Sequence, residues 1–298
     1  CKGRIYRHDA SEIQMIMNVQ MALDALKEDG VKMVNIGAHD IVEGNMKLIL
    51  GLVWCLIQRY QINAHTKIPA KKLIMAWLQS VLPEFKLTNF HSNWNDGRAL
   101  SALLEYCKPG LCPDWQQLRT EDALENCERA IALADRFLNI PPIISPSDLS
   151  SAELDEPSCI TYLSYFVKCN GPGYRATLER VRQMLPNMEV HDFEDCWKDG
   201  VILCALVEAV GGSIDGPMNM AVATNAQRIT NIRRALNGAS KLGVNSLVGA
   251  EDIADPRSDH LGIMALTSAL CSLSSPSKKP IKSECLQNQQ EAKWISTN

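Results

Sequence analysis

Apolar residues recur along most of this chain at intervals of three and four positions, which is the spacing of one face of an α-helix. In segment 11–28 these positions are occupied by Ile13, Ile16, Met17, Met21, Leu23 and Leu26. The pattern also predicts helices near 71–82, 96–107, 121–138, 156–167, 174–185, 199–210, 226–241 and 260–273. No run of β-branched residues alternates at period two for long enough to predict a sheet. The chain is therefore expected to be all-α.

The segment from 46 to about 60 has a different pattern, with apolar residues on every side of the predicted helix. Asn45 is a suitable N-cap for this helix, and Gly30 is expected to end the helix before it. A loop is expected between the two helices, around 37–40. Because a surface helix would show a polar face, the pattern predicts a central buried helix.

A sequence motif occurs twice and indicates a repeat. The two copies are Trp94-Asn95-Asp96-Gly97-Arg98-Ala99-Leu100 and Trp197-Lys198-Asp199-Gly200-Val201-Ile202-Leu203. An Asn followed by an Asp at nearly constant spacing marks three places: Asn18 and Asp40, Asn126 and Asp148, Asn231 and Asp252. The spacing between the two copies, from Trp94 to Trp197, is far longer than the roughly 20–50 residues of a solenoid repeat. The repeated units therefore have the size of domains. The first unit has no counterpart of the motif, and the chain is expected to begin inside it.

The motif also predicts local structure. In each copy the Asp can cap a helix, the Gly permits a close turn, and the Leu begins a core stripe. The Trp is expected to pack beneath the start of the helix, and the alternative is that it serves as a platform for a ligand. The motif residues are Trp94, Asp96, Gly97 and Leu100 in one copy and Trp197, Asp199, Gly200 and Leu203 in the other.

The repeat predicts how the chain is divided. The second and third units are complete, and each is expected to fold independently because each has its own motif and apolar helices. The expected boundaries are 1–62 for the C-terminal part of a first unit, 63–70 for a linker, 71–168 for the second unit, 169–173 for a linker, 174–273 for the third unit, and 274–298 for a disordered tail or linker.

The composition excludes several classes of protein. With 46% hydrophobic and 21% charged residues, the chain can form ordinary globular cores. Its net charge of −4 offers no broadly basic surface, so no nucleic-acid partner is expected. The longest apolar run, 48–57, is well below the roughly 20 residues that span a bilayer, so no transmembrane segment is expected.

No motif predicts catalysis. The chain has 11 cysteines without a CxxC pair, which favours reduced thiols. Cys107 and Cys112 could suggest a metal site, but their spacing is unusual for one and no His lies nearby. His39 lies beside Asp40 without a nucleophile placed by any motif, and the glycine-rich segment 211–216 lacks the Lys of a phosphate loop. Neither enzyme activity nor a cofactor is expected.

Taken together, these features resemble the calponin homology domain, a compact helical domain, over residues 11–273. Segment 40–54 resembles the last helix of the first domain in filamin-type actin-binding regions. The third unit is less similar to filamins because it lacks a counterpart of 111–115. The matches in the second unit are Thr88-Asn89-Phe90, Trp94, Gly97-Arg98-Ala99-Leu100, Leu111-Cys112-Pro113-Asp114-Trp115 and Thr161-Tyr162-Leu163-Ser164.

The resemblance implies a non-enzymatic F-actin-binding module of a cytoplasmic, filamin-type cross-linker or scaffold in the actin cytoskeleton. It also implies signalling or membrane-receptor partners for parts of such a protein outside this chain. The alternative is a signalling adaptor or regulatory array with little filament binding of its own. The actin-contact residues implied by the resemblance are Lys32, Asn45, Met46, Lys47, Leu48, Leu50, Gly51, Lys71, Lys72 and Met75.

These contact residues also have plainer explanations. The apolar residues within 48–57 can belong to a buried core, which is the commoner role for such a run. Lys71 and Lys72 can be solvated without touching any partner. The positions of these side chains in the fold are needed to decide between the explanations.

Overall fold

The computed structural model describes residues 5–6, 9–61, 68–216 and 224–274, and every regular element within them is helical. The first unit contains α1 (Glu12–Glu28), α2 (Ala38–Val42), α3 (Met46–Leu56) and a π-helical turn, η1 (Ile57–Gln61). The second contains α4 (Ala70–Val81), α5 (Arg98–Cys107), α6 (Ala123–Leu138), α7 (Pro146–Leu149) and α8 (Glu156–Val167). The third contains α9 (Pro172–Met184), α10 (Val201–Ala209), α11 (Asn225–Lys241), α12 (Ala250–Ala254) and α13 (His260–Leu273).

The prediction of an all-α fold is confirmed, and the long helices begin and end close to their predicted bounds. Four short 3₁₀ turns were not predicted: η2 (Pro83–Phe85), η3 (Trp115–Gln117), η4 (Thr120–Asp122) and η5 (Asp195–Trp197). Residues 275–298 of the predicted tail and residues 63–67 of the predicted linker 63–70 lie outside the described residues.

Local sequence signals explain where several helices begin. Ser11 caps α1 in a reciprocal pair with Gln14, in which each side chain accepts a hydrogen bond from the other residue's backbone N–H. Asn45 caps α3 as predicted, since its Oδ1 accepts from the backbone N–H of Leu48 at 3.4 Å. Pro157 lies in the first turn of α8, where its missing N–H removes no helical hydrogen bond.

The expectation of a loop around 37–40 is wrong, because this segment begins the short helix α2. The repeated Asp explains the helix. Asp40 Oδ2 accepts from the backbone N–H of Gly37 at 3.1 Å, and Asp252 Oδ2 accepts from Gly249 in the same way at the start of α12, also at 3.1 Å. A helix of about one turn is too short to produce a hydrophobic period, so the pattern could not reveal it.

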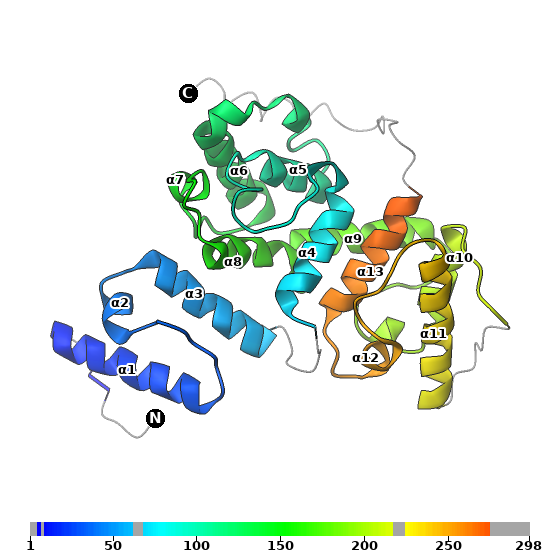
Figure 1. The fold of residues 1–298 in the computed structure, drawn as a ribbon, viewed down its shortest axis with the longest axis horizontal. Coiled ribbons are helices and arrows are strands. Elements are labelled where there is room, and N and C mark those ends of the chain that lie inside the picture. Colours follow the sequence, from blue (N-terminus) through cyan, green and yellow to red (C-terminus); the bar gives the residue numbers. More distant parts are fainter. Residues whose placement is uncertain (1–4, 7–8, 62–67, 217–223, 275–298) are drawn as a thin grey trace.

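The prediction that the helix after Asn45 is buried all round is also wrong. Leu50 and Trp54 are buried, but Met46 is 52% exposed, and most other apolar residues of α3 are only half-buried. Figure 1 shows α3 between α8 and the pair α1 and α2, and it packs mainly along α8. These neighbours cover only part of its circumference. An apolar pattern shows which residues can be buried but not how many neighbours are present to bury them.

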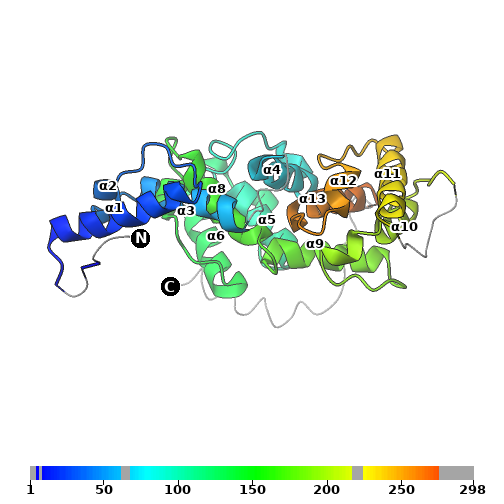
Figure 2. The same ribbon diagram turned by 90° about the horizontal axis from the view of Figure 1, so that it is seen from below.

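A single hydrophobic cluster runs through the second and third units and includes the end of α3. Within it, α4 packs more extensively against α13 of the third unit than against α8 of its own unit. Figures 1 and 2 both show α4 and α13 side by side near the middle of the molecule. The third unit's first helix, α9, packs against α5 and α8 as well as α13. The two units are therefore joined by a large helical contact.

His260, the first residue of α13, contributes a polar contact between the same units. Its Nε2 lies 2.7 Å from the carbonyl oxygen of Val167 in α8, and its Nδ1 lies 2.9 Å from Asp259 Oδ1. Burial lowers the pKa of His260, but the Asp259 carboxylate, the Val167 carbonyl and Glu194 more than offset this effect, so the pKa is raised. Because both ring nitrogens face acceptors, the doubly protonated imidazolium suits this position.

The stability contributed by His260 is expected to depend on pH. A raised folded-state pKa means that the contribution is fully present below the unfolded value of 6.5 and is lost as pH rises through the folded value. The urea midpoint of the unmodified chain should therefore fall relative to that of a His260→Gln variant as pH rises from about 6 to 9. A difference between the two midpoints that stays constant over this range would contradict the assignment.

Candidate binding surface

Both copies of the Trp-Asp-Gly motif have the same geometry at the start of a helix. Asp96 Oδ1 accepts from the backbone N–H of Arg98 at 3.0 Å, and Asp199 Oδ1 accepts from that of Val201 at 2.9 Å. The Asp side chain therefore satisfies one of the free N–H groups at the start of α5 and of α10, as predicted. The leucines of the motif are buried in both copies: Leu100 and Leu203.

The motif tryptophans are core residues. Trp94 is 1% exposed and Trp197 is 0% exposed. Their indole N–H groups donate to the backbone carbonyls of Asn89 at 3.1 Å and Asp192 at 2.7 Å. No ring face is open to a ligand, so the alternative of a ligand platform is wrong.

The motif glycines allow two helices to approach closely. Gly97 has φ +72° and Gly200 has φ +76°, a region that side chains rarely adopt. A Cβ on Gly97 would lie 2.7 Å from Asn126 Cβ and 2.8 Å from the backbone nitrogen of Cys127 in α6. A Cβ on Gly200 would lie 2.7 Å from the backbone nitrogen of Ile232 in α11. Only glycine fits this turn without a shift of the backbone.

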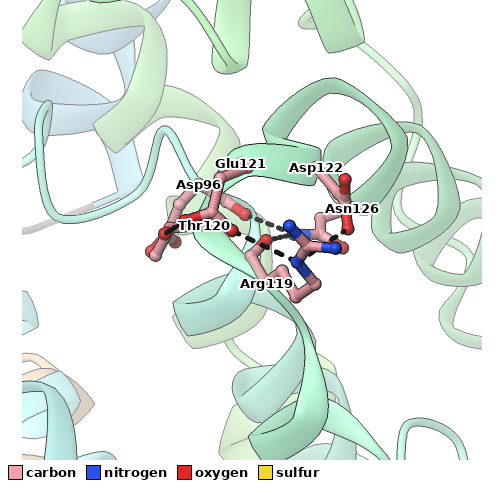
Figure 3. A network of polar contacts seen from close by, with 6 residues as sticks. All are labelled: Asp96, Arg119, Thr120, Glu121, Asp122 and Asn126. Carbon is pink, nitrogen blue, oxygen red and sulfur yellow. Dashed lines mark hydrogen bonds and ion pairs between the residues drawn. The ribbon is translucent and has the colours of Figure 1, made fainter.

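A buried asparagine ties the same turn to the facing helix. Figure 3 shows Asn126 donating its amide hydrogens to the backbone carbonyl of Asp96, at 3.0 Å, and that of Arg119, at 2.8 Å. In the third unit, Asn231 donates to the carbonyl of Asp199 at 3.2 Å. Sequence comparison of the units marked these asparagines but did not explain them. Their contacts show that the asparagines hold the motif turn against the facing helix.

The start of α3 is the most exposed part of the candidate surface. Asn45, Met46 and Lys47 are exposed, and Leu48 is half-buried. The N-cap and first turn of α3 therefore carry one amide, one lysine and two apolar side chains, of which only Leu48 is half-buried. Such a mixture of apolar area and charge is suited to contact with an acidic protein surface.

Two of the predicted contact residues lie deeper in α3. Leu50 is 4% exposed, and its carbonyl oxygen accepts a hydrogen bond from Thr161 Oγ1 of α8 at 3.2 Å. Leu50 therefore belongs to the α3–α8 contact and not to an exposed surface, which corrects the prediction for this residue. Gly51 is half-buried and faces Ile36, whose Cδ1 would lie 3.9 Å from a Cβ at this position.

The remaining predicted contact residues lie outside α3. Lys71 and Lys72 are exposed in the first turn of α4, and Met75 is half-buried one turn later. Lys71 Nζ is 2.6 Å from Glu156 Oε2 at the start of α8, so its charge is already paired within the molecule. Lys32 is exposed in the segment after α1. Of the two lysines in α4, Lys72 is therefore the better candidate for a partner.

The described residues contain no group of three or more His, Cys, Asp and Glu side chains that could hold a metal ion. The described cysteines are free, and burial raises the pKa of Cys112 to about 12 and that of Cys127 to about 12. These two thiols are therefore protonated at neutral pH and poorly nucleophilic.

Over the ranges that the structure describes, no helix has both the length and the apolar character needed to cross a membrane.

The repeated helices and motif agree with a comparison against protein families. The family model of the calponin homology (CH) domain matches residues 4–62, 68–171 and 178–275. The chain belongs to the calponin homology family. The three matches correspond to the three units described above, and we call these units CH regions; the third match begins within α9.

Curated relatives include filamins and alpha-actinins. The chain is 40% identical to filamin-C of Rattus norvegicus over 162 residues, which is 51% of this chain and 6% of the relative. It is 39% identical to filamin-A of Drosophila melanogaster over 194 residues, 59% of this chain and 9% of the relative. It is 38% identical to alpha-actinin-1 of Mus musculus over 160 residues, 52% of this chain and 18% of the relative. The matched part of each relative is thus under one fifth of its length.

Proposed function

We propose that this chain is a non-catalytic F-actin-binding module of a filamin-type cross-linker or scaffold in the actin cytoskeleton. The observation that carries the proposal is the exposed first turn of α3, in a chain whose CH regions resemble those of filamins. Asn45, Met46 and Lys47 are exposed and Leu48 is half-buried at the start of a helix that packs along α8. Lys72 on α4 adds a second cation to the proposed surface.

The proposed mechanism is surface complementarity without chemistry. The α3–α8 contact buries Leu50 and Trp54, which fixes the direction of the exposed first turn of α3. A surface held rigid in this way loses little conformational freedom when it meets a filament. Met46 and Leu48 would then supply apolar contact area, while Lys47 would attract an acidic partner and increase the rate of association.

Cosedimentation of the full chain with F-actin tests the proposal. A saturable fraction is expected to pellet with filaments at about 50 mM salt, and this fraction should fall at about 150 mM because salt screens exposed charges. Pelleting without filaments is the control for self-association, since α1 and α3 expose several apolar side chains. Failure to pellet with filaments at either salt concentration would contradict the proposal and favour an adaptor.

A further inference from the structure

The second and third CH regions exchange packing partners through their first helices. The first helix of the second region, α4, packs mainly on α13, the last helix of the third region. The first helix of the third region, α9, packs on α5 and α8 of the second region as well as on α13. Figure 1 shows this arrangement, with α4, α9 and α13 grouped between the remaining helices of the two regions. Each region therefore supplies part of the other's core.

A buried polar hub lies where α4, α5 and α9 meet. Trp77 of α4 donates its indole N–H to Thr177 Oγ1 of α9 at 3.0 Å, and the hydroxyl of Tyr106 of α5 lies 2.9 Å from the same oxygen. Thr177 in turn donates to the carbonyl oxygen of Gly173 at 2.8 Å. A hydroxyl offers one donor and two acceptor positions, so this arrangement uses all of them. Tyr106 must then be the donor in its contact with Thr177.

Burial keeps this hub in one protonation state. Trp77 and Thr177 are both 0% exposed, and burial raises the pKa of Tyr106 to about 12. Tyr106 therefore keeps its proton at neutral pH and can donate it to Thr177. The Arg180 guanidinium also lies over the Tyr106 ring, 5.1 Å from its centroid, which adds a second contact between α9 and α5.

Close packing around the hub leaves little room for another arrangement. A Cβ on Gly173 would lie 2.5 Å from Cη2 and 2.7 Å from Cζ2 of the Trp77 ring, so α9 accepts Trp77 only because this position is glycine. Further along α4, Ser80 Oγ lies 2.5 Å from Ser268 Oγ of α13. These contacts join the C-terminal half of α4 to both α9 and α13 of the third region.

We propose that the second and third CH regions form one cooperative folding unit, in which α13 and α9 of the third region hold α4 and the hub in place. The second region therefore depends on the third for the packing of its first helix. This revises the expectation that the two regions fold independently, and it does not depend on filament binding.

Native-state hydrogen exchange on the full chain tests this proposal. Ile232 is fully buried in α11, which packs on α10 and α12, and it takes no part in the hub. In an Ile232→Ala variant, the most protected amides of α6 in the second region should exchange at least about tenfold faster, in step with those of α10. Faster exchange in α10 with unchanged exchange in α6 would overturn the proposal.

A milder variant and a surface control keep the experiment informative. If Ile232→Ala does not fold, Ile232→Val removes one methyl group and should raise the rates in α6 and α10 together by about threefold. Thr230 is exposed on the same helix and donates only to its own helix, at Ala226, so Thr230→Ala should leave the rates in α6 unchanged. If Thr230→Ala increased the amide exchange rates in α6 as much as the Ile232 variant does, that result would also overturn the proposal.

A matched pair of threonine variants tests the hub itself. Thr177→Val keeps the shape of the side chain but leaves the donors of Trp77 and Tyr106 unpaired, so exchange in both α4 and α9 should be about tenfold faster. Thr267 is equally buried, but its hydroxyl donates only to Met264 within α13, so Thr267→Val should have a much smaller effect. Equal effects of the two variants would show that the hub does not join the regions.

Discussion

A Gly97→Ala variant of the full chain is expected to lose about 2–5 kcal/mol of the free energy of unfolding. Two effects contribute. Alanine at φ +72° has strain that glycine does not have, which costs about 1–2 kcal/mol. The added Cβ would also lie 2.8 Å from the backbone nitrogen of Cys127, so α5 and α6 must move apart, at a further cost of about 1–3 kcal/mol. Urea unfolding followed by circular dichroism measures the loss.

Gly243→Ala is the matched control, because Gly243 has φ +85° but no atom within 4 Å of a Cβ at that position. This variant should lose only the part of the free energy of unfolding that comes from backbone strain, about 1–2 kcal/mol. Gly200→Ala should behave like Gly97→Ala, since its Cβ would lie 2.7 Å from the backbone nitrogen of Ile232. If Gly97→Ala and Gly243→Ala lost the same free energy of unfolding, the close approach of α5 and α6 would add no measurable cost to the Gly97 substitution.

A Lys47→Glu variant is expected to weaken F-actin binding by roughly five- to thirtyfold, which is about 1–2 kcal/mol, because it places a negative charge against an acidic partner. Its stability should change by less than about 0.5 kcal/mol. Lys47 is exposed in the first turn of α3, where the helix dipole slightly favours an acidic side chain over a lysine. Cosedimentation at low and moderate salt measures the binding, and thermal melting measures the stability.

Lys27→Glu is the control for net charge. Lys27 is exposed in the last turn of α1, outside the proposed surface, and its reversal changes the chain's charge by the same amount. It should leave the affinity nearly unchanged. If Lys27→Glu weakens filament binding as much as Lys47→Glu does, the loss of affinity comes from the overall charge of the chain. If neither variant weakens binding, Lys47 is an ordinary solvated residue.

The candidate surface could be predicted only in part. The resemblance to filamins pointed to the start of α3, and the structure does expose Asn45, Met46 and Lys47 there. It also pointed to Leu50, which is buried against α8, and to Lys71, which is paired with Glu156. Whether a lysine is free or an apolar side chain is covered depends on neighbours distant in sequence. Hydrophobic periodicity carries no information about them.

The sequence by itself determined the helices, the repeat and the Asp-Gly turn at the start of α5 and α10, because each depends on residues close together in the chain. Only the tertiary structure decided that α3 is half-exposed and that α4 packs against α13. Trp77 and Thr177 meet across 100 positions of sequence, and nothing near either residue indicates the other. The local pattern specifies which helix faces are apolar, whereas the choice among similar faces depends on how closely whole helices fit together.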